Sequence, residues 1–140
     1  MRDRVLLHVE DEDITAFLLE TVLSESKVPV RLWRVGDGEE AIAFLKQTGK
    51  HRGAPRPDLV LLDLNLPRRT GLEILAEIRK SDGLRSLPVV VFTSSAHLAD
   101  RRNSLALGAS EFITKPRSLP GMLEAIHKAC SYFPQAGSEL

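Results

Sequence analysis

The sequence predicts a doubly wound α/β fold, in which helices cover both faces of a parallel β-sheet. Five short apolar runs alternate with five segments of helical periodicity, which is the pattern of repeated strand–helix units. The central runs are continuously apolar and rich in Val and Leu, as expected for strands that are buried on both faces. At 140 residues, the chain suits one such domain.

Four of the predicted strands end at polar side chains that can take part in chemistry. These ends are Glu10 and Asp11 after residues 5–9, Asp63 at the end of residues 58–63, Thr93 after residues 89–92, and Lys115 after residues 112–114. In an open α/β sheet the carboxyl ends of parallel strands meet at one edge, where ligands bind. The sequence therefore predicts that an acid pair, a lone Asp, a hydroxyl and a lysine share one site.

Helical periodicity and capping residues define the segments between the strands. In the first helix, four apolar residues at helical spacing are expected to form the buried stripe: Ile14, Phe17, Leu18 and Val22. Asp37 opens the second helix, Thr70 and Glu73 form a capping box for the third, and Ser118 opens the fifth. The fourth helix, about residues 98–107, has the weakest apolar stripe, so we expect it to be the most loosely packed.

The charge balance, the apolar runs and the cysteine count limit the partners and the cellular compartment that we expect for this chain. The 19 basic and 19 acidic residues cancel, so no broad attraction to nucleic acid or to an anionic membrane is expected. No apolar stretch approaches the roughly 20 residues of a membrane span, and the N-terminal apolar run is too short for a signal peptide. A single cysteine, Cys130, allows no internal disulfide, which agrees with a reducing compartment. We therefore expect a cytoplasmic protein that binds neither nucleic acid nor membrane.

The expected convergence of carboxylates points to a divalent cation. Two like charges about 4 Å apart repel by roughly 4 kcal/mol at an effective dielectric constant of about 20, so Glu10, Asp11 and Asp63 need a counter-ion. Mg²⁺ suits this set because it is a hard cation that binds one or two carboxylates together with water and phosphoryl oxygens. A carboxylate neutralised in this way can attack phosphorus and form an acyl phosphate.

This constellation resembles the receiver domain of two-component response regulators. The resemblance covers residues 4–130 and rests on four separate motifs in the right order and spacing. Residues 56–68 look most like the stand-alone receivers that partner bacterial phytochrome histidine kinases. The resemblance implies a flavodoxin-like sheet of five parallel strands in the order 2-1-3-4-5, and it leaves residues 131–140 as a flexible C-terminal tail.

The same resemblance implies a Mg²⁺ site with defined ligands. Asp11 and Asp63 would bind the ion directly, and the backbone carbonyl of Asn65 would be a third ligand. Glu10 would act through a water molecule. Asp63 would also be the phosphoacceptor, so the metal site and the phosphorylation site would share this residue.

Three further residues receive roles by resemblance. The Thr93 hydroxyl and the Lys115 ammonium group would each contact a phosphoryl oxygen, and a cis Lys115–Pro116 peptide bond would fix the direction of the lysine. Phe112 occupies the position of an aromatic residue that moves between exposed and buried positions in receivers. Thr93 and Phe112 would together form the conformational switch.

The function implied is that of a phosphoacceptor rather than of an enzyme with an external substrate. The chain would take a phosphoryl group from a sensor histidine kinase, with a bacteriophytochrome as the narrower candidate. Its own chemistry would be limited to self-phosphorylation from small donors and slow self-dephosphorylation. A homodimer is also expected, formed through the fourth helix, the strand that contains Phe112 and the fifth helix.

Two other functions remain open from the sequence. Phosphatases of the haloacid dehalogenase type also use an Asp at a strand end with Mg²⁺, but they need an acid two residues later, where this chain has Asn65. A pseudo-receiver would bind partners without phosphorylation, and the intact set of site residues argues against it. Taken singly, the residues have ordinary interpretations: Asp63 as a solvated acid, Phe112 as edge-strand packing and His8 as a neutral core residue.

Overall fold

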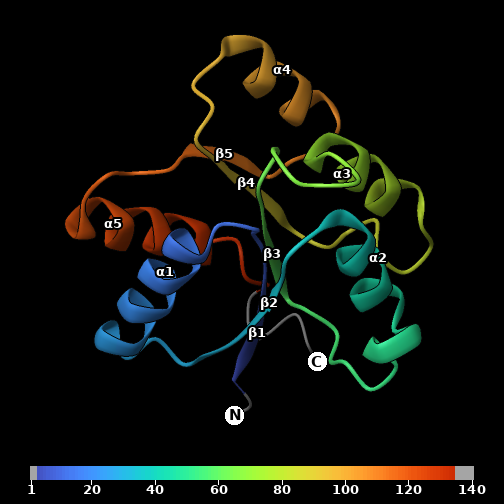
Figure 1. The fold of residues 1–140 in the computed structure, drawn as a ribbon, viewed down its shortest axis with the longest axis horizontal. Helices are drawn as coiled ribbons and strands as arrows, with labels where there is room; N and C mark the ends of the chain where they lie inside the picture. The colour runs from blue at the N-terminus through green and yellow to red at the C-terminus, as the bar shows by residue number, and fades with distance from the viewer. Residues whose placement is uncertain (1–2, 135–140) are drawn as a thin grey trace.

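The computed structural model describes residues 3–134 and contains one parallel sheet with helices on both faces (Figure 1). The strands are β1 (Arg4–Val9), β2 (Val30–Val35), β3 (Leu59–Leu62), β4 (Val89–Thr93) and β5 (Glu111–Thr114). The helices are α1 (Asp13–Ser26), α2 (Gly38–Lys46), α3 (Gly71–Lys80), α4 (Leu98–Ala106) and α5 (Leu119–Cys130), with a short 3-10 helix, η1 (Gly49–His51). The strand order is β2-β1-β3-β4-β5, so the predicted fold is confirmed.

Two apolar layers hold the sheet between the helices. In Figure 1, α1 and α5 lie together on one side of the sheet, and α2 and α3 lie on the other. Successive strand residues point to opposite faces, so Leu61 packs in the layer under α1 and α5, whereas Val60 and Leu62 pack in the layer under α2 and α3. All four residues of β3 are fully buried. The strand therefore delivers the residue that follows it to a fixed point.

The predicted buried stripe of α1 is wrong in part. Ile14 and Phe17 are 76% and 67% exposed, and the buried residues of this helix are Ala16, Leu19, Val22 and Leu23. Apolar residues occupy most positions between Ile14 and Leu23, so periodicity alone does not select which face is buried. Packing of α1 against α5 and the sheet selects it.

Helix α4 is the least buried of the α-helices, as predicted. Ser104 is its one buried residue, whereas each of the other four α-helices contains four. The end of α4 is held from α3, because the Arg79 guanidinium group donates to the carbonyl oxygen of Gly108 (Nη2–O 2.8 Å, Nε–O 3.1 Å). This helix therefore depends on few contacts for its position.

The C-terminal residues that the structure describes are packed. Tyr132 and Phe133 lie against the apolar layer under α1 and α5, and the Tyr132 hydroxyl donates to Glu111 at 2.6 Å. Residues 135–140 of the predicted tail lie outside the described residues, so their flexibility stays a prediction. Within residues 3–134, no helix combines the length and the apolar character needed to cross a membrane.

A close contact behind Asp63 fixes the turn between β3 and α3. Gly71 begins α3 and donates its N–H to the carbonyl oxygen of Leu64 at 3.0 Å. A Cβ atom on Gly71 would lie 2.3 Å from the Asp63 carbonyl oxygen and 2.7 Å from the Leu64 Cα atom. Thr70 and Glu73 form the predicted capping box, so α3 starts directly behind the acid.

The substitution Gly71→Ala tests this contact. We expect it to lower the free energy of unfolding by about 1–3 kcal/mol, because the added methyl group meets backbone atoms that cannot rotate away. Gly53→Ala is the matched control, since nothing lies within 4 Å of its Cβ position, and it should change stability by less than about 1 kcal/mol. Urea unfolding followed by circular dichroism measures both, and equal stability of the two variants would contradict the contact.

Candidate functional site

The predicted acids converge at the carboxyl ends of β1 and β3. Glu10, Asp11 and Asp63 each offer a carboxylate oxygen within 4.8 Å of the others. Glu10 and Asp63 are buried at 0% and 3% exposure, and Asp11 is exposed. The site is therefore open to solvent at Asp11 and closed behind the other two acids.

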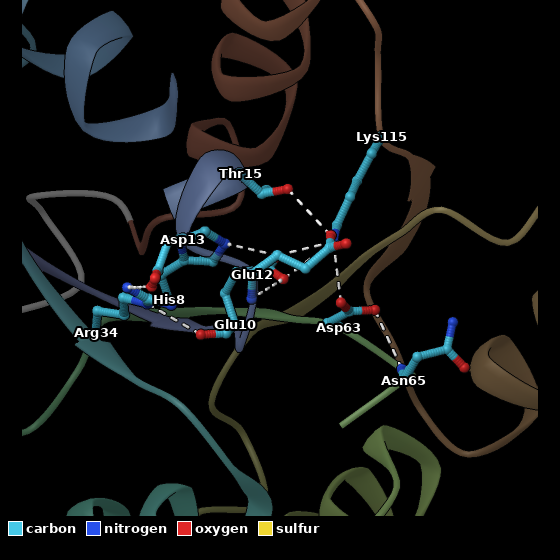
Figure 2. Close-up of polar contacts among 9 residues, drawn as sticks. All are labelled: His8, Glu10, Glu12, Asp13, Thr15, Arg34, Asp63, Asn65 and Lys115. Carbon is cyan, nitrogen blue, oxygen red and sulfur yellow. Dashed lines mark hydrogen bonds and ion pairs between the residues drawn. The ribbon is translucent and has the colours of Figure 1, made fainter. Parts of the chain in front are cut away.

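Lys115 places a positive charge beside the carboxylates of Glu10, Glu12 and Asp63, as Figure 2 shows. Its Nζ lies 2.9 Å from Asp63 Oδ2, 2.9 Å from Glu10 Oε1 and 3.0 Å from Glu12 Oε1. Burial alone would lower the pKa of Lys115, but its hydrogen bonds to the three acids raise the pKa above its ordinary value. The lysine therefore stays charged and offsets the repulsion between the carboxylates.

Sequence reasoning did not assign Glu12 to the site. Its carboxylate is on the exposed side of Lys115 and also accepts a hydrogen bond from the Thr15 hydroxyl at 3.3 Å. The signal that could have identified it is the acidic run at the end of β1, in which Glu12 directly follows Glu10 and Asp11. Glu12 is thus a third partner for the lysine at the rim of the site.

The pKa values of the two buried acids shift in opposite directions. Burial raises the pKa of Asp63, although the Lys115 ammonium group and the Asn65 N–H, 3.1 Å from Oδ1, act in the opposite direction. Burial would also raise the pKa of Glu10, but His8 and Lys115 outweigh it and lower the pKa to about 2. Glu10 is therefore ionised near pH 7, and Lys115 favours the charged form of Asp63 against the cost of its burial.

The donor set fits a hard divalent cation. Three carboxylates from two neighbouring strand ends provide oxygen ligands at compatible spacing, and Mg²⁺ prefers oxygen ligands of this kind. Asn65 lies beside Asp63 through the hydrogen bond from its N–H. The predicted ligand role of its carbonyl oxygen stays a prediction.

Thr93 and Phe112 occupy the neighbouring strands. Thr93 is fully buried at the end of β4, and its carbonyl oxygen accepts a hydrogen bond from the Lys115 N–H at 2.7 Å. Phe112 is 6% exposed and packs in the layer under α2 and α3. The structure thus has Phe112 in the inward of its two predicted positions, and the movement itself stays a prediction.

The prediction of a cis Lys115–Pro116 bond is wrong for this structure, because no peptide bond among the described residues is cis. The trans form is the ordinary preference even before proline. The direction of the Lys115 side chain is set instead by its contacts with Asp63, Glu10 and Glu12.

His8 is buried, as predicted, but it belongs to the surroundings of the site. Its side chain is 1% exposed, and its Nε2 lies 3.5 Å from Glu10 Oε1. Burial lowers the pKa of His8, which keeps the imidazole neutral near pH 7. Sequence reasoning placed the residue in the core and missed this contact.

Comparisons with known proteins agree with the fold. The family model for the response regulator receiver domain matches residues 6–127. The response regulator Rcp1 of Synechocystis sp. is 38% identical over 130 residues, which cover 93% of this chain and 88% of Rcp1. The phosphorylated cyanobacterial phytochrome response regulator RcpA superposes with a TM-score of 0.86 at 37% identity, over 94% of each chain.

The Mn²⁺-bound form of Rcp1 is equally similar. It superposes with a TM-score of 0.85 at 37% identity and covers 94% of this chain and 99% of its own. A family model that spans most of the chain, close sequence relatives and near-complete structural superposition all lead to one assignment. The chain belongs to the response regulator receiver domain family.

Proposed function

We propose that this response regulator accepts a phosphoryl group on Asp63 and signals through the conformational change that follows. The observation that supports this role is the position of Asp63 at the end of the buried strand β3. There its carboxylate contacts the Lys115 ammonium group and shares a site with Glu10 and Asp11. Asn65 stands where phosphatases of the dehalogenase type need a second acid, so acceptance of phosphate is favoured over its catalytic turnover.

The reaction needs a carboxylate nucleophile whose charge is compensated. An oxygen of Asp63 attacks the phosphorus atom of a donor phosphohistidine, the P–N bond breaks, and its electron pair stays on the imidazole of the donor. Lys115 compensates charge on the acceptor side. Asp11, Asp63 and the Asn65 carbonyl, with Glu10 acting through water, would hold Mg²⁺, which would supply further positive charge for the phosphoryl oxygens.

The response to phosphorylation is assigned to Thr93 and Phe112. The Thr93 hydroxyl can donate to a phosphoryl oxygen that exists only in the modified protein. Movement of Thr93 toward that oxygen would change the space available to Phe112 on the next strand, β5, which pairs with β4. Because α4 has one buried residue, it is the element that can adjust most easily to such a change.

A sensor histidine kinase is the proposed phosphodonor, and a kinase of the phytochrome type is the narrower candidate. RcpA, which covers the chain at 37% identity, is a cyanobacterial phytochrome response regulator. The cytoplasmic location expected from the composition stays a prediction and agrees with this partner.

The proposed homodimer uses the face formed by α4, β5 and α5. Leu98 and Leu105 are 58% and 41% exposed, and their spacing of seven residues places them on one side of α4. Apolar side chains of this kind can form a self-complementary contact between two copies of the chain.

Phosphorylation of Asp63 is tested with a small donor. Incubation with acetyl phosphate and Mg²⁺ should add one phosphoryl group, which intact-protein mass spectrometry detects and mild base removes. Asp63→Asn should give no adduct. Asp82→Asn, an exposed acid in the α3–β4 loop, is the control and should be labelled like the wild type. Equal labelling of Asp63→Asn would rule out Asp63 as the acceptor.

Metal binding is tested by calorimetric titration with Mg²⁺. Asp11→Ala removes a direct ligand and should lose far more affinity than Glu10→Gln, which removes a ligand that acts through water and should cost about tenfold. Equal affinities of wild type and Asp11→Ala would show that the ion binds elsewhere.

The dimer is tested by light scattering at tens of micromolar protein. The wild type should be dimeric, and Leu98→Asp should shift it toward monomer, because a carboxylate would be desolvated in the contact. Phe17→Asp is the matched control on α1, since Phe17 is similarly exposed, and it should remain dimeric. A monomeric wild type would reject the dimer, and an unaffected Leu98→Asp dimer would place the contact on another face.

A further inference from the structure

His8 is an unusual residue for the layer in which it lies. It occupies β1 on the same face as Leu6, under α1 and α5, and its ring lies 6.2 Å from the ring of Phe92. Its side chain is 1% exposed. Neither ring nitrogen has a hydrogen-bond partner among the residues that the structure describes. A buried polar group without a hydrogen-bond partner lowers the stability of the fold. The presence of His8 in this layer therefore indicates a function other than packing.

The Glu10 carboxylate lies close to the His8 ring (Figure 2). The distance of 3.5 Å from Nε2 to Oε1 is longer than the usual hydrogen bond of about 2.7–3.2 Å, so a small rotation of either side chain would form one. The other Glu10 oxygen, Oε2, already accepts the Glu12 N–H at 3.2 Å and the Lys115 ammonium group at 3.1 Å. His8 Nε2 is therefore the neighbour of Oε1 from within the core, at a distance from which it could become a donor.

Lys115 cannot contact the Glu10 carboxylate at every stage of the proposed reaction. Its ammonium group lies 2.9 Å from Glu10 Oε1 in the structure, but the proposed function needs the same group beside a phosphoryl oxygen on Asp63. When Lys115 turns to the phosphoryl group, Glu10 Oε1 keeps His8 as its neighbour. A neutral imidazole donates a hydrogen bond without adding a positive charge that would repel a divalent cation.

We propose that His8 is a positioning residue for the metal site, whose Nε2–H holds the Glu10 carboxylate toward Mg²⁺ when Lys115 turns to the phosphoryl group. The inference rests on the proposed function and adds to it a contact from outside the ligand set. It does not require His8 to change its protonation. Burial in the apolar layer lowers the pKa of His8 and so maintains the neutral form.

The experiment measures Mg²⁺ affinity by calorimetry for three variants. His8→Leu keeps the volume but removes the donor, and it should weaken Mg²⁺ binding by about tenfold, the lower end of the range for partners of metal ligands. His8→Gln offers an amide N–H at a similar reach and should restore affinity to within about threefold of the wild type. The double variant of His8→Leu with Glu10→Gln should bind no more weakly than Glu10→Gln alone, because His8 acts through Glu10.

A second measurement separates positioning from general damage. With acetyl phosphate as donor, His8→Leu should need about tenfold more Mg²⁺ for half-maximal phosphorylation, and its rate at saturating Mg²⁺ should stay close to that of the wild type. Thermal unfolding of each variant, without metal, reports whether the fold is retained.

Several outcomes would overturn the inference. Wild-type Mg²⁺ affinity in His8→Leu would reject the role outright. Additive losses in the double variant would show that His8 acts independently of Glu10, and a folded His8→Gln as weak as His8→Leu would show that packing matters rather than the hydrogen bond. Asp11→Ala separates failure of this inference from failure of the proposed metal site. If Asp11→Ala weakens Mg²⁺ binding and His8→Leu does not, only this inference fails. If Asp11→Ala has no effect, the metal site itself is rejected.

Discussion

The contact of the Lys115 ammonium group with Asp63, Glu10 and Glu12 is the interaction on which the site depends. Two of these acids are buried, and buried carboxylates that share one site repel each other strongly unless a cation lies between them. Lys115 comes from the far end of the chain, after β5, so the charge balance is established only when the whole sheet has formed. Folding and assembly of the site are therefore one event.

The two apolar layers make this arrangement possible. Helices cover both faces of the sheet, so polar side chains of the strands reach solvent mainly at the strand ends. The strand β3 is buried along its whole length and presents Asp63 at its end, and Gly71 lets the backbone of α3 approach directly behind that acid. His8 is an exception, since it brings a polar ring into the layer under α1 and α5 beside Glu10.

The elements around the site differ in how firmly they are held. The strands β1, β3 and β4 lie in the middle of the sheet and fix Glu10, Asp63 and Thr93. Helix α4, by contrast, buries one residue and is tied to α3 through the hydrogen bonds of Arg79. A rigid acceptor beside a lightly packed helix is a suitable construction for a switch, because a small change at the site meets little resistance at the surface.

The sequence by itself indicated the doubly wound fold class and the strand ends with Asp11 and Asp63, because these follow from local patterns of apolar runs and turns, whereas the strand order came from the resemblance to a family. It did not determine the buried face of α1, where apolar residues at most positions satisfy more than one helical stripe and only packing against α5 decides between them. Nor did it reveal the roles of Glu12 and His8. Glu12 meets an ammonium group 103 residues away in the chain, and the importance of His8 depends on how Glu10 is held from both sides. Such contacts exist only after the strands are placed next to one another, so the tertiary structure alone decided them.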